Sequence, residues 1–364
     1  PAGRRLGAGL RRLATPAALE AAPRPTPPHP IHDRAGLHDR FARKHTYLRL
    51  SLTERCSLRC GYCMPPEGVK LTAEQKLLTL PELMRVAEVM VRAGVTKIRL
   101  TGGEPLVRPD LEAVVEGLGA LRPLGLEHVA LTTNGIALAR RLPALRAAGL
   151  DSLNVSLDTL DRELFKRLCR RDGLHKVLAA LEAAHDEGYT PVKVNCVLLG
   201  GVNDHELGAF AELATRRPVD VRFIEYMPFG GNGWSEAKLV PAAVARERLR
   251  AEGFALEPVR THASDTARSF SLGPGALGRV SFISSMTEHF CSGCNRLRVT
   301  ADGNLKVCLF GGREVSLRDA LRAGASDADV LALVRGALAR KHARHAGMHE
   351  IARVADRPMT TIGG

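Results

Sequence analysis

The sequence predicts an α/β protein whose main domain is an incomplete (β/α)6 TIM-like barrel, with a smaller C-terminal α+β unit covering the open side. Between residues 46 and 227, six short β-rich runs alternate with amphipathic helical stretches. The connections between them are short, which is typical of parallel strands joined by helices. Six such units are too few to close a barrel, and the alternation ends near residue 228.

The individual elements follow from this alternation. The first helical stretch, 81–94, places Leu83, Val86 and Met90 on one face, and Gly94 ends it. The β-rich runs are short and bounded by glycine, proline and polar residues, as expected of strands. Strands are expected at 46–52, 97–102, 128–135, 152–158, 191–200 and 220–227.

Three segments are expected along the chain: an N-terminal extension over 1–44, the partial barrel over 45–228 and the C-terminal unit over 229–364. The extension is rich in Arg, Ala and Pro and begins with Pro instead of Met, so we expect a trimmed or incomplete disordered segment. It resembles a transit peptide followed by a Pro-rich linker, and the alternative is an extension without any targeting role. Within the C-terminal unit, we expect a helix over 236–252, a strand pair over 267–284 and helices near 315–345.

Composition and charge exclude several classes of protein. A hydrophobic content of 45% fits a globular protein, and no apolar run reaches the roughly 18–20 residues that span a bilayer, so no membrane partner is expected. The net charge is +13, of which residues 1–44 contribute +6. Only 4% of the residues are aromatic, whereas a groove for single-stranded nucleic acid needs interleaved aromatic residues, so no nucleic acid is expected. A phosphorylated small molecule accounts for the remaining basic excess.

Six of the eight cysteines fall in two groups of three, and the first group is Cys56, Cys60 and Cys63 in CSLRCGYC. Three thiolates leave one position of a metal centre open for a small molecule. The C-x3-C-x2-C spacing resembles the radical S-adenosylmethionine signature, and zinc with a fourth ligand is the alternative. Such short spacings favour metal ligation over disulfides and indicate a reducing compartment. The isolated Cys169 and Cys196 are expected to be structural thiols.

Other motifs follow later strands. The turn Gly102-Gly103-Glu104-Pro105 comes after the second strand, and its glycines allow a ligand to approach the backbone closely. TTNG follows the third strand, SLD lies within the fourth and EYM ends the sixth. Because the carboxyl ends of parallel strands meet at one rim, we expect these motifs to lie together there.

The second group, Cys291, Cys294 and Cys308, has the spacing C-x2-C-x13-C. Arg296 and Arg298 alternate along an expected strand beside it and therefore face one side. Guanidinium pairs suit a polyphosphate, and a cluster held by three cysteines leaves an iron free for a base nitrogen. A solvated edge strand beside a zinc knuckle is the alternative.

Across about residues 45–364, the chain resembles the GTP 3′,8-cyclase family of molybdenum-cofactor biosynthesis. The similar motifs are CSLRCGYC, TGGEPLVR, LTTNG, NVSLD, FIEYMP, HFCSGCNRLR, ADGNLKVCLFG and the terminal Gly-Gly. SFISSMTEHFC, HAGMHEI and RPMTTIGG are most similar to the eukaryotic members. The resemblance implies a lyase that converts GTP to (8S)-3′,8-cyclo-7,8-dihydroguanosine 5′-triphosphate in the first step of that pathway.

The resemblance also assigns site residues by matching positions, although it names no catalytic acid or base. It implies two 4Fe-4S clusters, one held by Cys56, Cys60 and Cys63 and the other by Cys291, Cys294 and Cys308. The implied contacts to S-adenosyl-L-methionine are Tyr62, Gly103, Ser156 and Met227. The implied contacts to GTP are Arg49, Arg99, Thr132, Lys193, Arg296 and Arg298. The tail residues Gly363 and Gly364 are expected to reach into the barrel beside the radical site.

The implied mechanism begins when an external electron donor reduces the first cluster. S-adenosylmethionine is then cleaved to methionine and a 5′-deoxyadenosyl radical, which removes the ribose 3′ hydrogen of GTP, and the sugar radical closes onto C8 of guanine. The product is expected to pass to cyclic pyranopterin monophosphate synthase. The expected location is the mitochondrial matrix, with the bacterial cytoplasm as the alternative, and a homodimer is one option for assembly.

Two other functions are compatible with the cysteine pattern. A radical S-adenosylmethionine peptide maturase with an auxiliary cluster would usually carry more C-terminal cysteines, and it leaves the terminal Gly-Gly unexplained. A non-enzymatic zinc protein is distinguished by metal analysis of anaerobically purified material. The two-cluster interpretation predicts about eight irons per chain from the ligand count, whereas the alternative predicts about two zincs.

Overall fold

The computed structural model describes residues 36–354 and 357–363 of the chain. The frame of this part is a twelve-stranded sheet with the order β12-β11-β10-β1-β2-β3-β4-β5-β6-β9-β8-β7. Strands β1 to β6 pair in sequence order and in parallel, as the sequence predicts. They span Tyr47–Ser51, Lys97–Thr101, His128–Thr133, Ser152–Ser156, Val192–Leu198 and Val219–Glu225.

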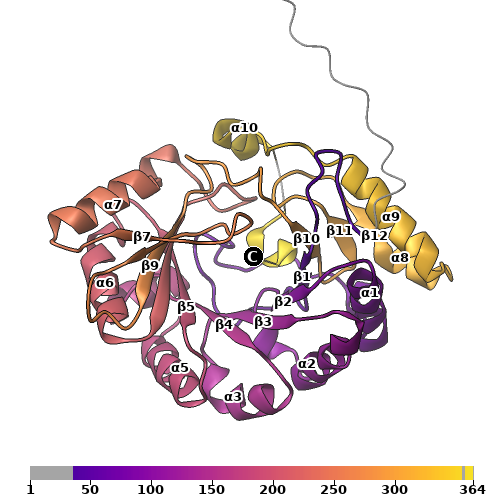
Figure 1. Cartoon of the computed structure of the whole chain (residues 1–364), viewed down its shortest axis with the longest axis horizontal. Helices are drawn as coiled ribbons and strands as arrows, with labels where there is room; N and C mark the ends of the chain where they lie inside the picture. The colour runs from indigo at the N-terminus through magenta and orange to yellow at the C-terminus, as the bar shows by residue number, and fades with distance from the viewer. Residues whose placement is uncertain (1–35, 355–356, 364) are drawn as a thin grey trace, which may run out of the picture.

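Helices alternate with these strands and lie around the outside of the molecule, with the strands inside and the C-terminal end near the centre (Figure 1). Helix α1 begins after Thr79, whose side chain accepts a hydrogen bond from the Glu82 backbone in a capping box. No helix in the described part of the chain is long and apolar enough to cross a membrane. Helices α1 to α6 span Leu80–Arg92, Leu111–Gly119, Leu138–Ala147, Arg162–Cys169, Leu174–Asp186 and Leu207–Arg216.

The two faces of the parallel strands differ in polarity because successive side chains point to opposite sides of a sheet. In β1, Leu48 and Leu50 are completely buried in the main hydrophobic cluster. Arg49 lies between them in the sequence and lines an internal cavity, as does Arg99 of β2. The apolar core therefore involves one face of the sheet, and the opposite face is left for charged groups.

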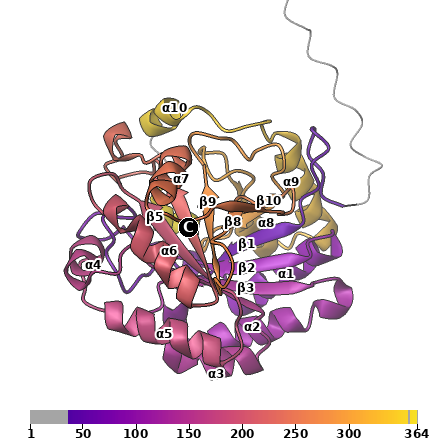
Figure 2. The same ribbon diagram turned by 60° about the vertical axis from the view of Figure 1, so that its left-hand side comes forward.

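The C-terminal unit is joined to the parallel strands through the sheet itself, because its strands extend the sheet at both edges. Strand β10 (Arg296–Val299) pairs in parallel with β1, and β9 (Arg279–Ile283) pairs in parallel with β6. Figure 2 shows β10 beside β1. The reason is that the backbone groups at each edge of the six-stranded array need partners, and these strands supply them.

The remaining C-terminal elements continue outward from these two strands or pack near them. Strands β8 and β7 follow β9 in antiparallel pairing, and β11 and β12 follow β10 in the same way. The strands β7, β8, β11 and β12 span Glu257–Val259, Arg268–Ser271, Asn304–Lys306 and Val315–Ser316. Helices α7 to α11 span Ala242–Ala251, Leu317–Arg322, Asp327–Ala339, Met348–Arg353 and Met359–Ile362.

The N-terminal extension ends earlier than predicted, since residues 36–44 are folded onto the domain. Leu37 is completely buried, and its carbonyl accepts a hydrogen bond of 2.7 Å from the His45 backbone. Asp39 forms an ion pair of 2.6 Å with Arg43, which also donates to the carbonyl of Cys291 at 2.7 Å. The expectation of disorder up to residue 44 is therefore wrong for this stretch, and residues 1–35 lie outside the described part of the chain.

Candidate active site

The first cysteine group lies in the loop that follows β1. The thiols of Cys60 and Cys63 are in hydrogen-bond contact, and Cys56 is near enough to Cys60 for their charges to interact. All eight cysteines of the chain are free thiols. Three converging, unbridged thiols on one loop suit a shared metal centre better than a disulfide.

The C-terminal end of α4 supports this loop. The backbone N–H groups of Arg59 and Gly61 donate to the carbonyls of Cys169 and Leu168 at 3.0 and 3.1 Å. The Cys169 side chain is also in hydrogen-bond contact with Cys60. A thiol that the sequence marks only as structural therefore lies against the first group, a proximity that sequence spacing does not reveal.

Tyr62, within the same loop, is held by a buried carboxyl group. Its hydroxyl donates to Asp158 Oδ2 at 2.5 Å, and the other oxygen of Asp158 accepts from the Val197 backbone at 2.8 Å. Burial raises the pKa of Asp158 to about 7, although the hydrogen bond from Tyr62 opposes this. Ser156, two residues before Asp158, ends β4. The sulfur of Cys196 lies 3.7 Å from the Asp158 carbonyl oxygen. The hydrogen bond between Tyr62 and Asp158 fixes the Tyr62 ring relative to the end of β4.

The Gly-Gly turn after β2 requires its glycines. A Cβ on Gly103 would lie 2.5 Å from the carbonyl oxygen of Glu54, so no larger residue fits there. The next residue, Glu104, accepts hydrogen bonds from the Thr133 hydroxyl at 2.7 Å and the Asn134 backbone at 2.6 Å. Asn134 in turn donates to Ser57 at 3.0 Å, in the cysteine loop. These contacts confirm that the cysteine loop, the Gly-Gly-Glu-Pro turn and the TTNG motif meet at one rim, as predicted.

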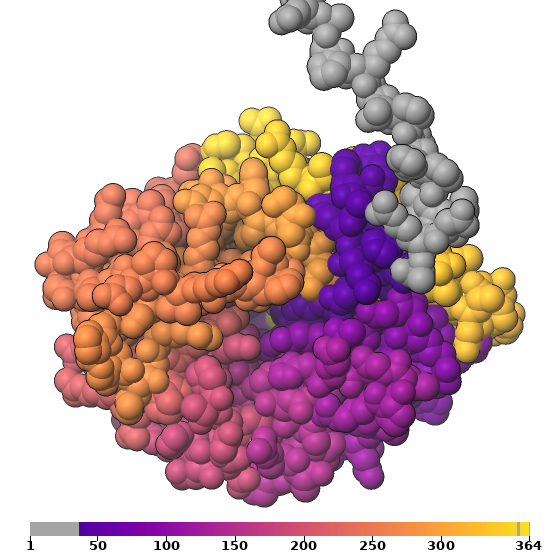
Figure 3. Space-filling model, viewed as in Figure 1, coloured from indigo at the N-terminus to yellow at the C-terminus, as the bar shows by residue number. Residues whose placement is uncertain are grey.

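A cavity of about 280 Å³ lies on the polar inner face of the sheet. Figure 3 shows a hollow between the orange C-terminal segments and the indigo-to-magenta first half of the chain. Among the described residues, eight lysine and arginine side chains line the cavity, against one carboxylate, that of Asp265. Such a lining suits a ligand with several negative charges. The eight cations are Arg49, Lys97, Arg99, Lys193, Arg222, Arg279, Arg296 and Arg298.

The pKa values of these groups show that their charges are crowded and poorly solvated. Burial, and then the charge of Arg222, lowers the pKa of Lys193 to about 7. Burial likewise lowers the pKa of Arg298 to about 9. For Tyr47, burial acts to raise the pKa, but Arg99 and other nearby cations outweigh it and bring the value down to about 7. A bound polyanion would relieve this repulsion.

Several polar atoms around the cavity are buried without a hydrogen-bond partner in the described structure. They are Arg49 Nε, Arg279 Nε, Arg296 Nη1 and Asn195 Oδ1. Buried polar groups are normally satisfied, and an unmet one costs about 1–3 kcal/mol. Their concentration at one cavity indicates that a polar ligand completes the site.

The second cysteine group borders the same cavity, since Cys291, Cys294 and Cys308 are all among its lining residues. Cys294 also receives a hydrogen bond of 3.4 Å from the ammonium group of Lys341, a residue that the sequence did not indicate. A cation at this distance stabilises the thiolate form, which is the form that binds metal. The predicted proximity of this group to Arg296 is confirmed.

Two histidines lie beside this second group. Ligand atoms of His289, Cys291 and His345 all lie within 4.8 Å of one another. The imidazole rings of His289 and His345 are in edge-to-face contact, with centroids 4.8 Å apart. Neither histidine was predicted as a site residue, although His289 lies in HFCSGCNRLR and His345 in HAGMHEI, because nothing in the sequence indicates that the two motifs meet.

The C-terminal segment enters the same region. The carbonyl of Gly363 accepts hydrogen bonds from Arg298 at 3.1 Å and from Arg49 at 3.5 Å. Gly363 has φ of +78°, a conformation that favours glycine, and it is buried. Gly364 lies outside the described residues.

The structure therefore brings together most of the predicted positions. Met227 lines the basic cavity with the arginines, and Thr132 lies next to Arg99, whose guanidinium is 3.4 Å from its hydroxyl. Sequence reasoning missed three of the cations, and alternation along a strand could have found one of them, because Lys97 lies two residues before Arg99 in β2. Arg222 pairs in register with a cavity residue of β5, which only the structure reveals.

The comparisons with known proteins agree with this arrangement. Residues 50–214 match the model of the radical SAM superfamily, and residues 219–347 match that of Molybdenum Cofactor Synthesis C. The fold is similar to that of Streptococcus suis SuiB, crystallised with S-adenosylmethionine, with a TM-score of 0.55 at 13% identity, covering 78% of this chain and 66% of that one. The fold and the first cysteine motif thus define a radical S-adenosylmethionine protein.

Similar curated proteins narrow this class. The chain is 53% identical to the mitochondrial GTP 3′,8-cyclase of Arabidopsis thaliana, over 92% of this chain and 85% of that protein. It is 42% identical to the GTP 3′,8-cyclase of Pelotomaculum thermopropionicum, over 90% of this chain and 100% of that protein. It is also 53% identical to human molybdenum cofactor biosynthesis protein 1, over 90% of this chain, but it spans only 51% of that protein. The chain belongs to the GTP 3′,8-cyclase family of molybdenum-cofactor biosynthesis.

Proposed function

We propose that this protein is a radical S-adenosylmethionine lyase that converts GTP to (8S)-3′,8-cyclo-7,8-dihydroguanosine 5′-triphosphate, the first step of molybdenum cofactor biosynthesis. The observation that carries the proposal is the basic cavity, where eight cations meet the second cysteine group. The triphosphate of GTP would neutralise the cations, and its guanine base would fill the open position of a metal centre. Membership of the family and the loop of Cys56, Cys60 and Cys63 support the radical chemistry.

The first cysteine group is proposed to hold a 4Fe-4S cluster with one iron open to S-adenosyl-L-methionine. When bound and reduced, the cluster supplies the electron that cleaves S-adenosylmethionine to methionine and a 5′-deoxyadenosyl radical. The protein's task is to position the cofactor. We propose that Tyr62, whose hydroxyl is held by Asp158, lies against the adenine, and that the bare backbone of Gly103 allows the cofactor to approach closely. Ser156 and Met227 are the other proposed contacts.

The inner face of the sheet is proposed to hold GTP. Arg49, Arg99 and Lys193 come from strands β1, β2 and β5 and line one cavity, where they can neutralise a triphosphate. Arg296 and Arg298 lie on β10, close to Cys294, and connect the phosphate region to the second cluster. Thr132 contributes through its contact with Arg99. Cys291, Cys294 and Cys308 are proposed to hold a second 4Fe-4S cluster that binds the guanine.

Exclusion of water is the second task of the protein, because a primary carbon radical reacts with any group that it reaches. Strands β9 and β10 lie at the two edges of the parallel array, and the segment that ends in Gly363 lies near the centre of the molecule. We propose that β1 to β6 with their helices form the six-unit partial barrel, which these C-terminal segments complete around the substrates.

The wider setting is part of the same proposal. An external donor supplies the electron, and cyclic pyranopterin monophosphate synthase consumes the product. The mitochondrial relative from Arabidopsis thaliana supports a location in the mitochondrial matrix. A homodimer is one option for assembly.

Serine substitutions test the proposal by separating the two cysteine groups. Cys56→Ser, Cys60→Ser and Cys63→Ser should abolish 5′-deoxyadenosine formation, because the iron that binds S-adenosylmethionine is lost. Cys291→Ser, Cys294→Ser and Cys308→Ser should mainly weaken GTP binding and leave slow, uncoupled cleavage. The measurement is 5′-deoxyadenosine yield without GTP, together with a GTP binding isotherm. Equal behaviour of all six variants would refute the division of roles.

A further inference from the structure

The C-terminal tail, defined as residues 357–363, connects the two halves of the candidate site. At one end, Met359 packs against the cluster formed by Tyr62, Leu199 and Tyr226, alongside the first cysteine group. At the other end, the carbonyl of Gly363 accepts hydrogen bonds from Arg298 and Arg49. Any displacement of this tail would therefore disturb both regions at once.

The tail has little structure of its own to keep it in place. Helix α11 contains only four residues, and an isolated helix of this length is unstable in water. Thr360, Thr361 and Ile362 are nevertheless buried. Contacts with the rest of the molecule must supply the stability of this conformation.

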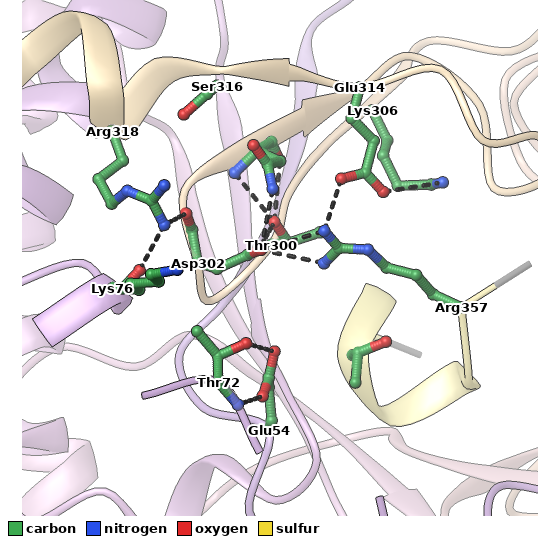
Figure 4. A network of polar contacts seen from close by, with 12 residues as sticks. Glu54, Thr72, Lys76, Thr300, Asp302, Lys306, Glu314, Ser316, Arg318 and Arg357 are labelled. Atoms are coloured by element: carbon green, nitrogen blue, oxygen red, sulfur yellow. Dashed lines mark hydrogen bonds and ion pairs between the residues drawn. The ribbon is translucent and has the colours of Figure 1, made fainter. Parts of the chain in front are cut away.

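One side chain at the start of the tail makes such contacts. The guanidinium of Arg357 binds both oxygens of Asp302, at 3.2 and 3.0 Å. The same group lies 2.8 Å from Glu314. Figure 4 shows Arg357 extending from the tail toward these two acids, which come from neighbouring C-terminal segments. We call Arg357, Asp302 and Glu314 the tail anchor.

The acids of the tail anchor are also held by contacts that do not involve Arg357. Asp302 accepts hydrogen bonds from Thr300 at 2.5 Å and from Asn304 at 2.9 Å. Glu314 lies 3.4 Å from the ammonium group of Lys306, which is completely buried at 1% exposure. The side chain of Arg357 is 31% exposed, whereas those of its two partners are 11% and 16% exposed. A bidentate pair between preorganised, mostly buried groups is geometrically specific.

The position of the tail anchor in the sheet links it to the proposed substrate site. Asp302 lies in the turn between β10, which carries Arg298, and β11, which is followed by Cys308. Arg357 is therefore attached to the same hairpin that supports the proposed GTP-binding arginines and the second cysteine group. The tail anchor keeps the tail in register with that hairpin.

We propose that Arg357 is a positioning residue for the radical reaction, and that its ion pairs with Asp302 and Glu314 hold the C-terminal tail between the two cofactor regions. The inference rests on the proposed function. Arg357 contacts neither substrate, so its effect is exerted through Met359 and Gly363. Loss of the tail anchor should release the tail and disturb its contacts near both cysteine groups, while the six cysteines themselves remain available to hold their clusters.

The test compares amide hydrogen exchange of the tail with turnover in the reconstituted full chain. Arg357→Ala should accelerate exchange of the 359–362 amides by about ten-fold or more, because the tail can then open without unfolding of the rest of the protein. The 5′-deoxyadenosine yield should fall by a similar factor at saturating GTP, with iron content unchanged. Arg357→Lys should recover part of both effects, because an ammonium group replaces the charge but not the bidentate geometry. Glu314→Gln, which keeps the Asp302 pair, should give intermediate values.

Arg318→Ala is the matched control. Arg318 donates to the carbonyl of Asp302 at 3.0 Å and to that of Lys76 at 2.8 Å, so it supports the same hairpin through other contacts. It should leave tail exchange at the wild-type rate. The inference is overturned if Arg357→Ala leaves tail exchange unchanged, if exchange rises without loss of turnover, or if Arg318→Ala reproduces both effects. Because exchange needs no turnover, a wild-type protein without cyclase activity would refute the proposed function and still permit the exchange test.

Discussion

At the scale of single residues, the main feature of the site is an excess of cations that the protein itself does not neutralise. Lys193 of β5 illustrates it, because Arg222 of β6 and Arg99 and Lys97 of β2 all lower its pKa, whereas Asp220 of β6 has a smaller, opposing effect. Burial is the largest cause, and the resulting pKa is about 7. This value makes the lysine sensitive to both pH and ligand.

Binding of GTP should therefore be accompanied by proton uptake. Above pH 7, Lys193 is mostly neutral in the free protein, whereas a bound triphosphate favours the ammonium form and raises its pKa. GTP affinity should fall as the pH rises above 7, by at most about ten-fold per pH unit for this residue. Below pH 7, the lysine is charged in both states, so this contribution disappears. Calorimetric titration at pH 8 in buffers with different ionisation enthalpies measures the uptake.

Lys193→Arg is the control, because an arginine remains charged over this range. It should take up fewer protons than the wild type at pH 8. Tyr47, whose pKa is also about 7, can contribute uptake of its own, and Tyr47→Phe removes that part. Equal proton uptake by the wild type and Lys193→Arg would show that Lys193 does not respond to the nucleotide.

The residues that sequence could predict are those with a local signal. Cys56, Cys60 and Cys63 have a diagnostic spacing, and alternation on a strand pairs Arg296 with Arg298. Asp158 belongs to the predicted SLD motif, but its partner could not be predicted, and Lys341 gave no usable signal, because both partners lie far away in the sequence. Asp158 contacts Tyr62 96 positions away, and Lys341 contacts Cys294 47 positions away. Such contacts depend on tertiary packing.

At the scale of elements, the C-terminal tail depends on a backbone conformation that only glycine adopts easily. Gly363→Ala would place a Cβ 2.6 Å from the Thr101 hydroxyl and 2.9 Å from Ser51 Cβ, at φ of +78°. The left-handed conformation alone costs a non-glycine residue about 1–2 kcal/mol. We therefore expect displacement of the tail and a loss of 5′-deoxyadenosine yield of about ten-fold or more, with GTP affinity less affected.

Gly324→Ala separates backbone strain from collision. Gly324 has a similar φ of +82°, but its added Cβ would meet nothing within 4 Å. It should lower stability modestly without affecting radical formation, as measured by thermal unfolding and 5′-deoxyadenosine yield. Full activity of Gly363→Ala would mean that the tail tolerates displacement.

Element boundaries were predicted best where a short-range signal marks them. Helix α1 starts at a capping box around Thr79, and all six parallel strands begin within one residue of the predicted start and end one or two residues before the predicted end. The helix expected over 236–252 begins only at Ala242, because Pro241 precedes it and Glu236–Lys238 form a separate 3-10 turn. The proline therefore explains why this helix starts six residues later than predicted.

At the scale of the whole molecule, sequence periodicity predicted an α/β fold but not which strands pair. The strand pair expected over 267–284 is confirmed as β8 and β9, but its sequence does not indicate that β9 pairs with β6. Nothing local indicates that β10 joins the opposite edge, beside β1. The choice of partner is decided by the free edges and the packing of the entire sheet, so a sequence pattern that marks a strand leaves its neighbour undetermined.

The central claim is that one cavity brings the ribose of GTP to a radical derived from S-adenosylmethionine. The most direct measurement is anaerobic incubation of the reconstituted full chain with S-adenosylmethionine, dithionite and GTP deuterated at ribose C3′, followed by mass analysis of both products. The account predicts a cyclised nucleotide and 5′-deoxyadenosine that is heavier by the replacement of one hydrogen by deuterium. Formation of 5′-deoxyadenosine without deuterium, and with GTP recovered unchanged, would contradict it.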